Sequence, residues 1–187
     1  MHQDSASIIG SELSPNEKLL WSGQPLTGIR IVKQDAFMIP FSIMWGGFAI
    51  FWELGVIASK APFFFMLWGI PFVLIGLYLI FGRFFVDAKQ REKTFYGLTD
   101  ERVIIVSGIF DRSVKTLNLK TLSEINLDEK PDGSGSIIFG SIYLPTGRSM
   151  GNGWPGSNRY APPSFGLIKN VREVYELVRS AQNENSR

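Results

Sequence analysis

Two long runs of apolar residues dominate the hydrophobic pattern of the chain. The run Pro62–Gly82 contains no charged residue, and the run Phe37–Ser59 contains one, Glu53. About 20 apolar residues let a helix cross the roughly 30 Å of hydrocarbon in a bilayer, and lipid offers the backbone no hydrogen-bond partners outside the helix. The pattern therefore predicts a hairpin of two transmembrane helices.

A very short connection joins the two runs, because only Ser59, Lys60 and Ala61 precede Pro62. The helices should therefore be antiparallel neighbours, with both chain ends in one compartment. The basic residues near the open side of the hairpin are Lys18, Arg30, Lys33, Arg83, Lys89, Arg91 and Lys93, against Lys60 alone in the turn. Under the positive-inside rule, both termini are expected in the cytoplasm.

Glu53 is an ionisable residue inside a predicted membrane segment, a position that often marks an ion or proton relay. It lies about two helical turns before the turn at Ser59–Lys60, within reach of the interface. A single hairpin also offers no second carboxylate and no polar cavity. We therefore interpret Glu53 as an end-of-helix or helix-packing residue.

The segment before the hairpin contains one local signal. Ser14-Pro15-Asn16-Glu17 has the form of a capping box with proline at the first helical position. We therefore expect a short amphipathic helix that starts at Pro15, continues through Lys18–Trp21 and is stopped by Gly23 and Pro25. Met1–Gly10 carries no strong pattern and is expected to be mobile.

After Arg83 the pattern changes to short β-rich stretches separated by glycine, proline and aspartate. The predicted strands are Thr94–Thr99, Arg102–Ser107, Ser113–Leu119, Leu122–Leu127 and Ser136–Gly140, with tight turns at Asp100-Glu101 and at Asp132–Gly135. A closing helix should begin after Asn170 and bury Val171, Val174, Tyr175 and Val178. This is an α+β plan with three parts: an N-terminal cytoplasmic segment (1–36), the hairpin (37–82) and a cytoplasmic domain (83–187).

Four features of this region stand out: the hairpin sequence Tyr96-Gly97-Leu98-Thr99-Asp100-Glu101-Arg102-Val103-Ile104-Ile105, the following Gly108, the stretch Leu119–Leu127 and the closing helix. In these features the chain resembles the bacterial pleckstrin-homology (PH)-like domains. The resemblance extends from Phe37 to about Ala181. It implies a preceding two-helix membrane hairpin, a bent or barrel-like antiparallel sheet capped by the last helix, and a place in the bacterial inner membrane. Domains of this fold bind lipid headgroups, bind peptides or self-assemble.

The stretch Ser141–Pro163 departs from the family pattern, because a long run rich in glycine, proline and asparagine replaces a short connection. It contains Arg148, Trp154, Arg159 and Tyr160, residue types that are common in binding surfaces. Glycine-rich flexibility equally fits an insertion without a role. We treat these four residues as candidate contacts to a protein partner.

Composition removes several classes of function. The chain has no cysteine, and His2 is its single histidine. The residues that most often bind transition metals, act as nucleophiles or transfer protons near neutral pH are therefore almost absent. A net charge of +2 does not indicate a nucleic-acid surface, and the glycines of the insertion lack the P-loop lysine. We therefore expect no cofactor, no metal and no catalytic site.

The sequence thus favours a non-enzymatic membrane-anchored module that contacts a protein partner or a second copy of itself. The first alternative is binding of anionic lipid headgroups, for which Arg83, Lys89, Arg91 and Lys93 are the candidate contacts. The second alternative is a subunit of a small transporter or enzyme. Two helices form a transport path only when several copies assemble, and the carboxylates are scattered singly.

Reporter fusions test the expected topology. A reporter fused before Met1 and one fused after Arg187 should both give cytoplasmic signals, because the short turn enforces a hairpin and the basic residues lie on its open side. A periplasmic signal from the C-terminal fusion would contradict the orientation, and opposite signals from the two ends would contradict the hairpin.

Overall fold

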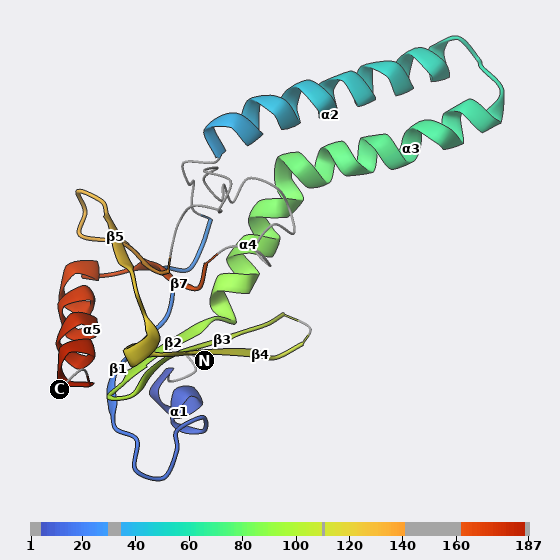
Figure 1. The fold of residues 1–187 in the computed structure, drawn as a ribbon. Helices are drawn as coiled ribbons and strands as arrows, with labels where there is room; N and C mark the ends of the chain where they lie inside the picture. The colour runs from blue at the N-terminus through green and yellow to red at the C-terminus, as the bar shows by residue number, and fades with distance from the viewer. Residues whose placement is uncertain (1–4, 30–34, 110, 141–161, 186–187) are drawn as a thin grey trace. The chain divides into compact units, whose positions relative to one another are not determined.

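The computed structural model describes residues 5–29, 35–109, 111–140 and 162–185 (Figure 1). These residues form two compact units. The described residues within 1–28, 89–150 and 160–187 make up the first unit, and those within 29–88 belong to the second. The long apolar helices lie in the second unit, and the strands lie in the first.

The second unit contains the predicted pair of apolar helices. Helix α2 spans Asp35–Ala58 and α3 spans Phe63–Leu77; a π-helical turn, η1 (Tyr78–Gly82), then leads into α4 (Arg83–Glu92). By length and composition, Asp35–Ala58 and Phe63–Glu92 are each apolar enough to cross a membrane. The second helix is longer than the sequence predicted, because it runs ten residues past Gly82 into the polar α4.

Glycine lets α2 and α3 approach each other closely. A Cβ atom added at Gly76 would lie 2.7 Å from the Cα of Gly46, so neither position has space for a side chain. The carboxylate of Glu53 lies against Gly69 in the same interface, and its Oε2 has no hydrogen-bond partner among the described residues. This position agrees with the helix-packing interpretation of Glu53.

The first unit contains two antiparallel sheets that are not closed into a barrel. One sheet has the order β1-β2-β3-β4 and the other has the order β5-β6-β7. The strands are β1 (Leu19–Gly23), β2 (Phe95–Thr99), β3 (Arg102–Ser107), β4 (Ser113–Asn118), β5 (Ile125–Glu129), β6 (Gly135–Phe139) and β7 (Ser164–Ile168). A 3-10 turn, η2 (Leu119–Thr121), connects the two sheets. The five predicted strands are confirmed within a few residues, and β7 was not predicted.

The prediction of a short helix from Pro15 through Trp21 is wrong, because Leu19–Gly23 forms strand β1. The capping contact itself forms, since the Ser14 amide donates to Glu17 Oε2 at 2.8 Å. No helix follows, because β1 instead pairs with β2, placing Leu19 opposite Thr99. A helix this short would gain few backbone hydrogen bonds, whereas pairing with the edge of β2 gives β1 a ladder of them. The segment before the hairpin therefore belongs to the same compact unit as the sheet.

Residues 5–10 pack against the sheet, contrary to the expected mobility of Met1–Gly10, whose first four residues lie outside the described part of the chain. Helix α1 (Ser5–Gly10) buries Ile9 completely. Ile9 lies over Gly97 in β2, where an added Cβ would be 2.5 Å from its Cγ2 atom. The glycine of the family motif therefore makes room for Ile9, and Phe95, Ile104 and Val106 complete this smaller core.

Helix α5 (Val171–Asn185) packs on the main core of the sheets. It buries Val171, Val174, Val178 and Ala181, as the predicted stripe required, and Tyr175 is partly buried against the same core. Leu177 on the same helix is 42% exposed. An apolar side chain therefore remains at the surface of α5.

Substituting Val174 tests the packing of α5. Val174→Asp would place an unpaired carboxylate at a position that is 3% exposed, and should destabilise the first unit by several kcal/mol. Leu177→Asp is the matched control on the exposed side of the same helix and should cost less than about 1 kcal/mol. Limited proteolysis of the full chain measures the difference. Equal resistance of the two variants would contradict the packing.

Candidate functional site

The basic residues next to the apolar helices differ in their partners. Arg83 makes an ion pair with Asp35 at 2.8 Å, and its guanidinium lies 4.4 Å from the centre of the Phe84 ring. The Nε and Nη2 atoms of Arg83 are buried and have no hydrogen-bond partner among the described residues. Arg83 is thus neutralised by an acidic partner but keeps unpaired donors.

The other three predicted headgroup contacts lie in the first unit. Lys89 pairs with Glu92 at 3.0 Å on the exposed surface of α4, and Arg91 donates through Nη2 to the Gly28 carbonyl at 3.2 Å. Lys93 is exposed. These residues are close in sequence, but Lys89 pairs with Glu92 whereas Arg91 bonds to the Gly28 carbonyl. The other predicted contacts, Arg148, Trp154, Arg159 and Tyr160, lie outside the described residues.

Two concave surfaces in the described part of the first unit lie beside α5. One cleft has a volume of about 430 Å³ and is formed by residues 21–27, residues 168–170 and the start of α5. A second cleft of about 630 Å³ lies along the other side of the same helix, between α5 and the turn that carries Glu129 and Gly133. Both clefts share Asn170, Glu173 and Leu177. We call them the α5 clefts.

Two residues with left-handed backbone shape the first cleft. Leu167 has φ 52° and Asn170 has φ 48°, which bends the chain between β7 and α5. Asparagine tolerates this conformation, but leucine does so only when its surroundings hold it. The Leu167 amide donates to Ser136 Oγ at 3.1 Å, and its carbonyl accepts from the Leu26 amide at 2.7 Å. These bonds fix residues 24–27 as the wall of the cleft.

The α5 clefts combine an apolar centre with a charged rim that has a small acidic excess, because its charged residues are Glu129, Glu173 and Glu176 against Lys169 and Arg172. Leu177 is exposed at their shared border, and Trp21, whose ring lies 5.4 Å from Phe165, forms part of the floor. Glu173 and Glu176 supply negative charge, while Arg172 pairs with Glu129. An exposed leucine next to carboxylates suits a partner segment that brings an apolar side chain and basic neighbours.

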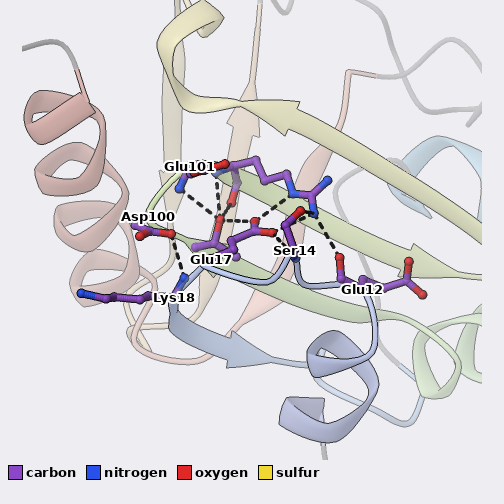
Figure 2. Close-up of polar contacts among 8 residues, drawn as sticks. Glu12, Ser14, Glu17, Lys18, Asp100 and Glu101 are labelled. Carbon is purple, nitrogen blue, oxygen red and sulfur yellow. Dashed lines mark hydrogen bonds and ion pairs between the residues drawn. The ribbon is translucent and has the colours of Figure 1, made fainter.

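A buried ion pair holds the N-terminal part of this arrangement to the sheet (Figure 2). Arg102 grips Glu17 with two parallel bonds of 2.8 Å, from Nε to Oε1 and from Nη2 to Oε2. The same guanidinium donates to the Glu12 carbonyl at 3.0 Å. The Glu17 side chain is fully buried, so this pair is partly withdrawn from water. We call it the Glu17–Arg102 clip.

Thr99 connects the clip to the turn between β2 and β3. Its hydroxyl donates to Glu17 Oε1 at 2.8 Å and accepts from the amides of Glu101 and Arg102 at 3.2 and 2.9 Å. Beside it, the Lys18 amide donates to Asp100 Oδ1 at 2.9 Å, and the Asp100 amide returns a bond to the Lys18 carbonyl at 3.1 Å (Figure 2). These bonds align β1 with β2 and so place the residues that follow β1.

The remaining residues of the family motif also make identifiable contacts. The Tyr96 hydroxyl accepts from the Gly166 amide at 3.0 Å, and burial raises the pKa of Tyr96 to about 12. Its ring lies 4.8 Å from that of Phe165 in β7. Leu98 is completely buried in the main core. Tyr96 therefore joins the two sheets, while Gly97, Thr99 and Arg102 attach the N-terminal segment.

The clip makes stability depend on pH in the acid range. Hydrogen bonds from Arg102 are the main cause that lowers the pKa of Glu17 from 4.5 to about 2. A carboxyl with a lowered pKa stabilises the folded state above its unfolded pKa, and this contribution, about 3 kcal/mol, is lost as the pH falls from 4.5 towards 2.

Glu17→Gln should therefore lower the free energy of unfolding at pH 7 by about 3 kcal/mol, because it removes the charge but leaves Arg102 in place. The gap between the variant and the original chain should close as the pH falls from 4.5 towards 2. Chemical unfolding of the full chain in detergent, followed by protease susceptibility, measures both effects. Glu101→Gln, on the exposed neighbour, is the control and should match the original chain. A constant gap across this pH range would contradict the clip.

Among the described residues, no group of three or more histidine, cysteine, aspartate or glutamate side chains could hold a metal ion. No curated protein and no solved structure shows a significant match to the chain. The family model described as "Bacterial PH domain" matches residues 36–181, which include both apolar helices, strands β2–β7 and most of α5, but not β1. Since this match covers most of the chain, the protein belongs to the bacterial PH domain family.

Proposed function

We propose that this protein is a non-enzymatic, membrane-anchored module that holds a segment of a protein partner in the α5 clefts, at the inner face of a bacterial membrane. The observation that carries the proposal is the exposed Leu177 at the border of two clefts, next to Glu173 and Glu176. Family membership supports an interaction module, because PH-like folds serve chiefly as binding scaffolds.

The order of the elements supports the anchor. The two apolar helices are inserted between β1 and β2, which are hydrogen-bonded neighbours in one sheet. The chain must therefore leave the sheet and return to the same side of any membrane. Two crossings in a hairpin satisfy this requirement, and one crossing would not. Both ends of the hairpin would then lie in the compartment that contains the sheets.

Protein contact is favoured over binding of lipid headgroups because Arg83 and Lys89 already have acidic partners. A surface that attracts anionic lipid needs unpaired cations, each worth about 1 kcal/mol. The unpaired donors of Arg83 are the feature that favours an anionic group, so the experiment includes vesicles.

A photo-reactive amino acid at position 177 tests the proposal in the full chain, expressed in bacterial membranes. It should yield a protein adduct of defined mass, and the same probe at the exposed Asn183, outside both clefts, should yield none. Glu173→Lys combined with Glu176→Lys should remove the adduct, because it reverses the charge of the rim.

Equal adducts from both positions, or no adduct, would contradict contact through the clefts. Vesicles of matched charge but different headgroups should bind the full chain equally. A diffuse attraction is screened by salt and does not distinguish headgroups, whereas a shaped site also discriminates by hydrogen bonding. Headgroup-selective retention that is lost on Arg83→Gln would favour the lipid alternative.

A further inference from the structure

Strand β4 is an exposed edge of the first sheet. It pairs with β3 over six positions, from Ser113 opposite Ser107 to Asn118 opposite Arg102. No other strand among the described residues pairs with its second edge. Five of its six residues are exposed, and Leu117 is half-buried. The outer position of β4 is visible in Figure 1, where β2, β3 and β4 lie in sequence across the sheet.

An edge strand of this kind presents unpaired N–H and C=O groups that can pair with another strand. Natural proteins usually block such edges with proline, bulges or charged side chains, lysine above all. The sequence Ser-Val-Lys-Thr-Leu-Asn has no proline and a single charge, Lys115, and its pairing with β3 is regular. Val114 is 39% exposed and Thr116 is exposed, and both residue types favour extended structure.

Strand β4 can pair with β4 of a second copy in a register that keeps the two Lys115 side chains apart. Residues opposite each other in an antiparallel pair point to the same side of the sheet. When a two-fold axis perpendicular to the sheet relates two identical strands, one residue must therefore lie opposite its own copy, at the axis. An axis at Lys115 would place two ammonium groups opposite each other, which is unfavourable. An axis at Thr116 places threonine opposite threonine, a favourable cross-strand pair, and sets Lys115 opposite Leu117 of the second copy.

We propose that β4 pairs in antiparallel fashion with β4 of a second copy of this chain, with the two-fold axis at Thr116. The two four-stranded sheets then form one continuous eight-stranded sheet across the dimer. Thr116 lies opposite Ile104 of β3 and therefore shares the face of the sheet on which α1 packs. The α5 clefts are not part of this contact, so the proposal stands apart from the proposed function.

Single cysteines test the register, because the chain contains none of its own. In the proposed dimer the two residues at position 116 face each other with Cα atoms about 5 Å apart, within the range of a disulfide. The two residues at position 114 are four positions out of register, about 14 Å apart. Under mild oxidation of the full chain in membranes, Thr116→Cys should form at least roughly tenfold more covalent dimer than Val114→Cys.

Equal dimer formation by the two variants would reflect random collision and would overturn the proposal, and so would preferential formation by Val114→Cys.

A second measurement does not depend on cysteine. Thr116→Lys should convert the chain from dimer mass to monomer mass in detergent, because it places two charges face to face, whereas Lys120→Ala just beyond the strand should leave the dimer intact. Since Thr116 is exposed, the variant should keep the protease resistance of the original chain. A dimer that persists in Thr116→Lys, or a monomeric original chain, would overturn the proposal.

Discussion

The first unit depends on the Glu17–Arg102 clip, because this ion pair makes a sheet from two segments that are far apart in sequence. Glu17 and Arg102 are separated by the whole apolar hairpin, and bringing such segments together costs chain entropy. A fully buried carboxylate also loses its hydration. Two parallel bonds from Arg102, one from Thr99 and one from the Ser14 amide replace that hydration. With the carboxylate satisfied, β1 can complete the sheet next to β2.

The clip explains why the family motif is so compact in sequence. Tyr96, Gly97, Thr99 and Arg102 lie within seven residues, yet together they contact three distant segments. Tyr96 reaches β7, Gly97 accommodates Ile9, and Thr99 and Arg102 hold Glu17. The hairpin β2–β3 is thus the part of the fold on which the N-terminal segment, the second sheet and the insertion point of the apolar helices converge. A change at one of these positions should therefore affect segments on both sides of the apolar insertion.

Sequence patterns predicted the elements whose signals are local. The apolar runs, the turn at Asp100-Glu101 and the stripe on α5 need no distant partner to be recognised, and all three are present. Strand β1 was mistaken for a helix because its capping contact is local while its pairing partner lies about 75 residues away. Strand β7 has glycine at its centre and follows two prolines, so it lacked a strand pattern. The α5 clefts were not predicted because three separate segments form them.

The same clip also restricts where the sheet can take a further strand. The first sheet has two outer strands, β1 and β4. After β1, the bond from the Leu26 amide to the Leu167 carbonyl turns the chain towards the second sheet, and residues 23–27 become the wall of a cleft. Strand β4 has no comparable contact among the described residues, and most of it is exposed. The clip therefore commits one edge of the sheet to the α5 clefts, which leaves β4 as the edge where another chain can add a strand.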